Sequence, residues 1–159
     1  MRPILEEYWG RLQSLHEGIE GAIEGLPQVA LDWVPGPGMN SLGVLVAHIA
    51  GAERYWIGDV AGRDPSGRDR AAEFRTQGLD GTALRARLSM VLAHSRAVLA
   101  GLTLAELEAL RVSPRNGQKF TVAWALAHAL EHTALHLGHI QITRQLWDKY
   151  QTEQDVAAN

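Results

Sequence analysis

The last helical pattern in the sequence, from about Thr121 to Tyr150, constrains the fold more than any other feature. Apolar residues cover most of its circumference. Its polar residues gather on one narrow edge, which carries Glu131, Gln141, Gln145 and Lys149. A helix that is apolar around most of its surface belongs in a protein core. We therefore expect this segment to be a long helix that other parts of the chain cover.

Three further helical patterns precede it, each with apolar residues three or four positions apart. They cover residues 3–25, 41–57 and 82–99. Pro3 suits the first turn of the first helix, and Asn40 or Ser41 can cap the second. Thr82 can open the third helix, and Thr121 can cap the last. The sequence thus predicts four helices with recognisable starts.

The segments between these patterns carry loop signals. Residues 33–40 are dense in proline and glycine, and residues 58–81 mix glycine, proline, arginine and aspartate, so both are expected to be irregular. A short helical turn at 104–110 and a turn at 113–117 are expected before the last helix. No segment alternates apolar and polar residues over a useful length, so strands are not expected. The pattern predicts an all-α fold, a four-helix bundle with long crossover loops, as a single domain over residues 1–159.

Composition limits what such a bundle can do. The chain has 159 residues, of which 46% are hydrophobic and 21% charged, as is usual for one globular domain with a real core. A net charge of −3 gives no electrostatic basis for binding nucleic acid or an anionic membrane. The absence of cysteine excludes disulfides, thiolate nucleophiles and cysteine-ligated zinc. No stretch resembles a signal peptide or a membrane span, so we expect a cytoplasmic protein.

Several ionisable residues are expected to have no special role. Arginines cluster in the 58–81 segment but are interleaved with carboxylates: Arg63, Arg68, Arg70 and Arg75 alternate with Asp64, Asp69 and Glu73. A solvated loop is the expected result. Glu53, near the end of the second helix, is likewise expected to be solvated. His16 and His94 are expected to be ordinary surface or packing residues.

Four of the seven histidines lie on the last helical pattern: His128, His132, His136 and His139. Because a helix advances about 100° per residue, these side chains project from one stripe about 80° wide. Two imidazoles at positions i and i+4 are one turn apart, so both can reach one metal ion. The stripe has apolar flanks, where unpaired imidazoles are costly to bury. Metal binding or a lined pocket would explain them, and hydrogen-bonded packing is the alternative.

His48, on the apolar second pattern, is a fifth candidate, although a lone histidine in such a place is more often a hydrogen-bonded core residue. The metalloprotease pattern does not fit, because Glu131 precedes His132 and does not follow the first histidine of a pair. The paired carboxylates of a di-iron bundle are also missing. Histidine-only ligation favours zinc, nickel, copper or iron(II) over magnesium or calcium.

Two segments resemble the DinB-like family of four-helix-bundle metalloproteins. The sequence GMNSLGVLVAHIA at residues 38–50 is similar to that family's second helix. The sequence EHTALHLGHIQ at residues 131–141 is similar to its C-terminal His-x-x-x-His-x-Gly motif. The order and separation of the two segments also match, so the resemblance covers essentially the whole chain. His139 departs from the family pattern, in which glutamine often follows the glycine.

The resemblance implies three ligands for one divalent metal ion, with zinc or nickel as the first candidates: His48, His132 and His136. Spacing alone does not choose this pair on the last helix over His128 with His132. His128 is a candidate for orienting a ligand or a substrate, with a packing role as the alternative. For His139 three readings stay open: a further ligand, a contact that orients one of the ligands, or no role at the site. Trp56 and Trp124 are candidates for walling the metal pocket, although aromatic residues at these spacings are usually core.

The resemblance also implies a function. The family includes metal-dependent transferases and isomerases that use low-molecular-weight thiols such as bacillithiol and mycothiol, so a small-molecule substrate and thiol S-transfer are expected. Three imidazoles leave zinc an open position for a thiolate or for water, and a metal-dependent hydrolase is the near variant. A non-catalytic stress-associated module that binds a metal or ligand, and a plain structural bundle, are the alternatives. We also expect a homodimer, since bundles with an apolar outer face often pair.

Overall fold

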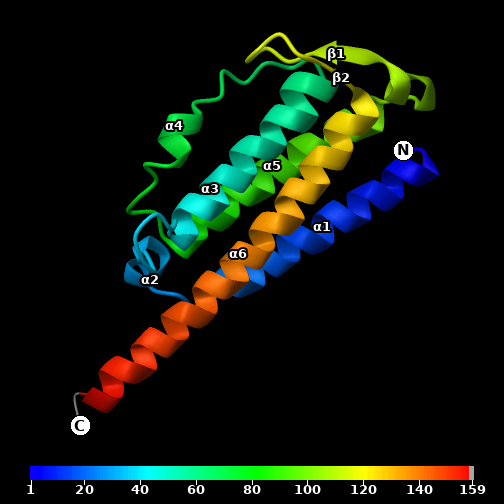
Figure 1. Ribbon diagram of the computed structural model, residues 1–159. Helices are drawn as coiled ribbons and strands as arrows, with labels where there is room; N and C mark the ends of the chain where they lie inside the picture. Colours follow the sequence, from blue (N-terminus) through cyan, green and yellow to red (C-terminus); the bar gives the residue numbers. More distant parts are fainter. Residues whose placement is uncertain (158–159) are drawn as a thin grey trace.

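The computed structural model describes residues 1–157 and shows four long helices (Figure 1). They are α1 (Pro3–Ile23), α3 (Leu42–Glu53), α5 (Gly81–Gly101) and α6 (Val122–Ala157). A π-helical segment, Arg54–Ala61, continues α3. The shorter elements are α2 (Gln28–Asp32), α4 (Arg70–Glu73), a 3₁₀ turn (Leu104–Glu108) and the strands β1 (Leu110–Val112) and β2 (Lys119–Thr121). The predicted four-helix bundle is confirmed, with a small hairpin added at one end.

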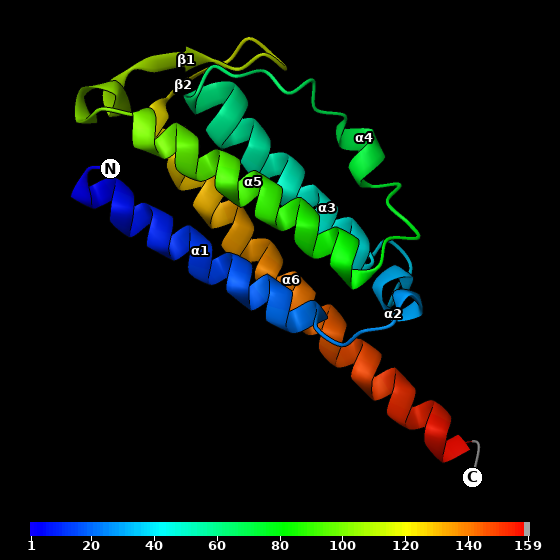
Figure 2. The ribbon, with the colours of Figure 1, turned by 180° about the vertical axis from the view of Figure 1, so that it is seen from behind.

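The four long helices form a closed ring of contacts. Helix α6 packs against α1 and α3, and α5 packs against the same two helices from the other side (Figures 1 and 2). The C-terminal part of α6 runs on beyond the other helices (Figure 2). No helix in the described range 1–157 combines the length and apolarity needed to cross a bilayer.

Two apolar clusters fill the bundle, one toward each end. The cluster nearer the hairpin is built from Leu5, Leu12, Tyr55, Ile57, Val60, Leu99, Val122, Ala125, Leu126 and Ala129, among others. The cluster at the opposite end contains Ile19, Ile23, Leu31, Leu42, Leu45, Val46, Ile49, Leu84, Leu88 and Ile140. Helices α1, α5 and α6 contribute to both clusters, while α3 contributes to one and its π-helical continuation to the other. Each helix therefore passes through a level between the clusters, and polar residues occupy that level.

This central polar layer consists of His16, Glu53, Ser95 and Thr133, one residue from each long helix, all of them buried. The Glu53 carboxylate lies 2.6 Å from Nε2 of His16 and accepts a hydrogen bond of 2.7 Å from Oγ of Ser95. The expectation that Glu53 is solvated is therefore wrong, since its side chain is 1% exposed. Its carboxylate tolerates burial because two neighbouring helices supply hydrogen-bond partners.

Local capping explains where the helices begin. Ser41 Oγ accepts from the Val44 backbone N–H and caps α3, and Thr121 Oγ1 accepts from the Trp124 N–H at the start of α6, as predicted. The predicted opening of the third helix at Thr82 is wrong, because Asp80 caps α5 and the helix begins at Gly81. An aspartate two residues earlier is the stronger acceptor for the free N–H groups of the first turn.

Other boundaries also differ from prediction. The second helix does not stop at Ile57, since its π-helical continuation reaches Ala61, and α6 runs to Ala157, well past Tyr150. The segment predicted as a helical turn at 104–110 ends at Glu108 and gives way to β1, which pairs antiparallel with β2 around the predicted turn at 113–117. The expectation of no strand is thus wrong. Strands of three residues are too short to show an alternating pattern.

Helix α6 is less completely covered than its apolar pattern predicts. Its large apolar side chains on the outer side are solvent-exposed: Trp124, Leu135, Ile142 and Leu146. The covered side carries Ala125, Ala129, Thr133 and Ile140. The expectation of burial around most of the circumference is therefore wrong, because the elements that contact this long helix leave its outer side uncovered: α1, α3 with its π-helical continuation, the 3₁₀ turn and β2.

The packing of α5 generates a stability prediction. Leu88 is fully buried in the cluster away from the hairpin, whereas Met90, two residues later, is 69% exposed. We expect Leu88→Ala to lower the free energy of unfolding by about 2–5 kcal/mol, because it leaves a cavity in a packed core. Met90→Ala should change it by less than about 0.5 kcal/mol. Urea unfolding followed by circular dichroism measures both, and equal losses would contradict the described packing.

Candidate metal centre

Three histidines meet on one side of the central polar layer. His48 comes from α3, while His132 and His136 come from consecutive turns of α6. Each offers a ring nitrogen, and the three nitrogen atoms lie within 4.8 Å of one another. Nε2 of His48 is 3.1 Å from Nε2 of His132. The ring of His48 is buried and the other two rings are half-buried, so a small ion between them would be largely shielded from solvent.

The helices place these rings at the level where the two apolar clusters separate. His48 lies one residue before Ile49 of one cluster and seven residues before Tyr55 of the other. On α6, His132 and His136 fall between Ala129 and Ile140. Spacing of four residues stacks the two α6 rings on one face, with ring centroids 4.4 Å apart.

Burial keeps the α6 imidazoles neutral. Desolvation, together with the neighbouring imidazoles of His136 and His48, lowers the pKa of His132 to about 3. Desolvation and the proximity of His48 and His139 lower the pKa of His136 to about 4. Both rings are therefore unprotonated at neutral pH, which is the form that binds metal ions.

The carboxylate of Glu73 contacts this group, although the sequence predicted that Glu73 lies in a solvated loop. Glu73, the last residue of α4, is buried, and its Oε2 lies 2.9 Å from Nδ1 of His48. Arg68 donates two hydrogen bonds to the same carboxylate, at 2.6 and 2.8 Å. Burial alone would raise the pKa of the Glu73 carboxyl, but the hydrogen bonds from Arg68 and His48 outweigh it and lower that pKa. The expectation that the whole 58–81 arginine cluster is solvated is therefore wrong for Arg68.

Aromatic rings line one side of the three-histidine group. The ring of His128 stacks on Trp124, with planes 10° apart and centroids separated by 4.9 Å, and it also contacts Trp56 at 4.8 Å. Phe120 completes this aromatic cluster against Trp56 and Trp124. His128 is 5.9 Å from His132, centroid to centroid, and is not among the three nitrogen donors that converge.

The remaining histidines lie elsewhere. His139 is exposed, and its Nδ1 is 3.2 Å from Nδ1 of His136, so it neighbours the group from the solvent side. His94 is hydrogen-bonded to Asp64, and His16 belongs to the central polar layer. Both agree with the expectation of packing or surface roles.

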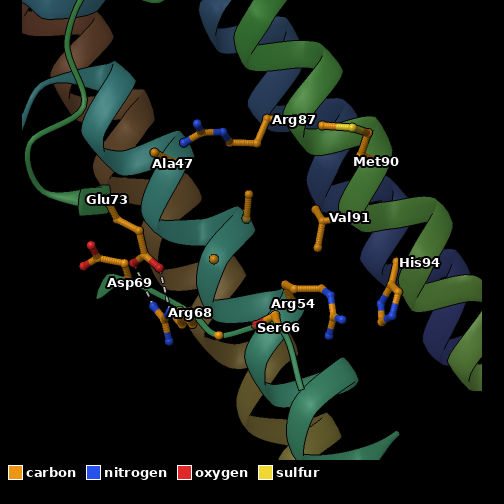
Figure 3. A pocket seen from close by; sticks show the side chains of 13 residues that line it. Ala47, Arg54, Ser66, Arg68, Asp69, Glu73, Arg87, Met90, Val91 and His94 are labelled. Carbon is orange, nitrogen blue, oxygen red and sulfur yellow. Dashed lines mark hydrogen bonds and ion pairs between the residues drawn. The ribbon is translucent and has the colours of Figure 1, made fainter. Parts of the chain in front are cut away.

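Two cavities lie beside the Arg68–Glu73 pair, and Arg68 lines both of them. One, of about 420 Å³, lies between α3, α5 and the segment before α4, and Glu73 and Arg68 form part of its wall (Figure 3). The other, of about 330 Å³, is lined by Tyr55, Arg68, Arg70 and Arg115, among others. The guanidinium of Arg70 rests 4.6 Å from the centre of the Phe74 ring, which itself lies 4.8 Å from the ring of His48.

The three histidines fit a divalent metal ion by their chemistry and spacing. Two imidazole nitrogens on one tetrahedral zinc ion are about 3.3 Å apart, and the Nε2 atoms of His48 and His132 lie 3.1 Å apart. With Nδ1 of His48 directed at Glu73, its Nε2 carries the free lone pair. Neutral imidazoles suit zinc, nickel, copper and iron(II). The group is therefore a candidate site for such an ion.

Comparison with solved structures supports the fold assignment. YfiT from Bacillus subtilis, described as a probable metal-dependent hydrolase with an unusual four-helix bundle topology, matches with a TM-score of 0.70 at 17% identity, over 91% of this chain and 89% of YfiT. A DinB-like protein from Bacillus subtilis matches with a TM-score of 0.68 at 19% identity, over 87% and 90% of the two chains. The predicted DinB-like fold is confirmed.

A mycothiol-dependent maleylpyruvate isomerase matches with a TM-score of 0.63 at 15% identity, over 84% of this chain but only 59% of the isomerase. No curated protein matches the sequence. The family model for mycothiol-S-transferase matches residues 9–149, which is most of the chain and includes all three histidines of the candidate site. The chain therefore belongs to the mycothiol-S-transferase family.

Proposed function

We propose that this protein is a divalent-metal-dependent transferase that joins a low-molecular-weight thiol to a small electrophile. The observation that carries the proposal is the convergence of His48, His132 and His136 on one point, in a chain of the mycothiol-S-transferase family. Zinc and nickel are the first candidates for the ion, as histidine-only donors favour late transition metals. Mycothiol, bacillithiol or a related thiol is the proposed co-substrate.

The protein's own residues would hold and shield the ion. His48, His132 and His136 would bind it through ring nitrogens, and the lowered pKa values of His132 and His136 limit competition from protons at those two rings. An ion held by three imidazoles supplies a Lewis acid with an open position, at which the pKa of a thiol is lowered. The apolar surroundings strengthen every charge interaction at that position, because they exclude water.

The surroundings of the site favour an electrophile with an apolar body. Trp56, Phe120 and Trp124 form an aromatic cluster with His128, whose ring neighbours that of His132. Arg70 and Arg115 line the 330 Å³ cavity and form no ion pair within the described part of the chain. They would suit a carboxylate or another anionic group on the substrate or on the thiol.

A metal-dependent hydrolase is the second candidate. The observation in its favour is the similarity to YfiT, which is described as a probable metal-dependent hydrolase. The same open position would then activate water instead of a thiol. A module that binds a metal or a small ligand without turnover is the non-catalytic alternative.

Metal content is the first test of the proposal. After incubation with zinc or nickel and removal of excess ion, the wild-type protein should retain about one ion per chain, because three donors converge at one place. His132→Ala should retain less than about 0.1 ion per chain. His94→Ala, which removes a histidine paired with Asp64 outside the group, serves as the control and should load like the wild type. Elemental analysis gives the ratios, and an unloaded wild type would contradict the site.

The pH dependence of the stability of the metal-free protein tests whether the His132 and His136 imidazoles are neutral. Since the pKa values of His132 and His136 are lowered to about 3 and about 4, only the unfolded chain takes up these two protons as pH falls below about 6.5. Their contribution to stability is therefore present above pH 6.5 and lost progressively as the pH falls, toward about 4 for His136 and about 3 for His132. The free energy of unfolding, measured in urea at several pH values, should fall less steeply with decreasing pH for the His132→Gln/His136→Gln double variant than for the wild type. Parallel declines would show that the two rings titrate normally.

Activity assays distinguish the proposed thiol transferase from the hydrolase. Zinc- or nickel-loaded protein is mixed with mycothiol, bacillithiol or glutathione and the electrophile monochlorobimane, whose fluorescence reports thiol conjugation. We expect conjugation with at least one thiol, and its reduction to the rate in buffer alone for metal-free protein and for His132→Ala. Parallel assays with ester and amide substrates test the hydrolase. Conjugation absent from every thiol and metal pairing would count against the transferase.

A further inference from the structure

Glu73 is held against the back of His48 by contacts that leave it little freedom. Its carboxylate lies 2.9 Å from Nδ1 of His48, and Arg68 donates to both of its oxygens from Nε and Nη2. Both carboxylate and guanidinium are largely buried. A bidentate arginine fixes the plane of a carboxylate as well as its position. The Arg68–Glu73 pair therefore acts as one rigid acceptor directed at His48.

We propose that Glu73 is a positioning residue, which fixes the tautomer and the ring orientation of His48 so that Nε2 of that ring is free to bind the metal ion. The proposal rests on the metal site put forward above. Arg68 in turn positions Glu73. Neither residue is proposed to touch the ion.

The hydrogen-bonding chemistry sets the tautomer. A carboxylate that already accepts two hydrogen bonds from Arg68 can only accept from His48, so the proton of the neutral imidazole resides on Nδ1. Nε2 then presents its lone pair toward Nε2 of His132, 3.1 Å away. Histidine ligands in metalloproteins commonly donate their second N–H to such a carboxylate, and this contact also raises the basicity of the ligating nitrogen.

Helix α3 is shaped to admit the Glu73 carboxylate. Gly51, one turn after His48, lies directly beneath it, and a Cβ at this position would overlap Oε1 of Glu73. Figure 3 shows Glu73 and Arg68 joined beside this helix. A glycine inside a helix is less favourable than an alanine. Gly51 here provides the space through which the carboxylate reaches His48.

The rest of α4 supports the same contact. Asp69 Oδ1 accepts from the Ala72 N–H and caps this short helix. Phe74, directly after Glu73, rests its ring 4.8 Å from the ring of His48, and Arg70 covers Phe74. The crossover segment thus contacts His48 twice, through a carboxylate and an aromatic ring. A plain structural role, in which Arg68 and Glu73 only fasten the crossover, predicts no change at the histidines.

Glu73→Gln tests the role directly. The side chain keeps its size, but its amide loses the charge and one acceptor. We expect Co²⁺, titrated as a probe with a visible absorption band, to bind about 10–100-fold more weakly than to wild type, with a changed spectrum. Nitrogen-15 NMR of the metal-free protein should show His48 protonated at Nδ1 in the wild type and as a tautomer mixture in the variant. Glu131→Gln, an exposed change beside His132, is the matched control and should behave like wild type.

Gly51→Ala keeps the proposal testable should Glu73→Gln unfold the protein. The added methyl group must displace the Glu73 carboxylate and so weaken its contact with His48. We expect weaker Co²⁺ binding by a variant that still unfolds cooperatively in urea, which shows that it is folded. Gly10→Ala on α1, where a methyl group meets nothing within 4 Å, is the control.

Wild-type affinity and an unchanged His48 tautomer in both Glu73→Gln and Gly51→Ala would overturn the positioning role and leave the metal site standing. A wild-type protein that binds no Co²⁺ would overturn the metal site itself, and this role with it. The two failures are therefore distinguishable in one set of titrations.

Discussion

The burial of polar side chains between two apolar clusters is the constraint on which the remainder of this structure depends. At the middle of the bundle, Glu53 is satisfied by His16 at 2.6 Å and by Ser95 at 2.7 Å. On the α3–α6 side of the same level, His48 is satisfied by Glu73 at 2.9 Å. Buried ionisable groups are tolerated only when they are paired in this way. The pairing joins α1, α3 and α5 at one level and holds the crossover helix α4 against α3.

The two α6 histidines have only other imidazoles, and no carboxylate, as partners among the described residues, and this difference gives the site its chemical character. Desolvation and mutual proximity lower the pKa values of His132 and His136, so protons cannot satisfy them at neutral pH. Nδ1 of His132 is buried without a hydrogen bond from any described residue. These incompletely satisfied imidazoles lower the stability of the fold. Such local losses of stability are typical of functional sites. A bound cation is the natural partner for three neutral imidazoles.

The sequence was sufficient for the features that local chemistry determines. Ser41 and Thr121 were identifiable as caps, and four-residue spacing placed His132 and His136 on one face. The choice of these two with His48 came from the family resemblance. The roles of Glu53 and Glu73 were missed because their histidine partners lie 37 and 25 residues away, and no local pattern connects them. The hairpin and the exposed side of α6 were missed for a similar reason, because strand length and helix coverage are set by the packed whole.

Diffraction at the zinc absorption edge, from crystals of the zinc-loaded protein, is the most direct test of metal binding by the three histidines. A single strong anomalous peak is predicted about 2.0–2.1 Å from one ring nitrogen each of His48, His132 and His136, with Nδ1 of His48 still facing Glu73. No peak at this position, or a peak held instead by His128 or His139, would contradict the proposed centre and the transferase chemistry that depends on it.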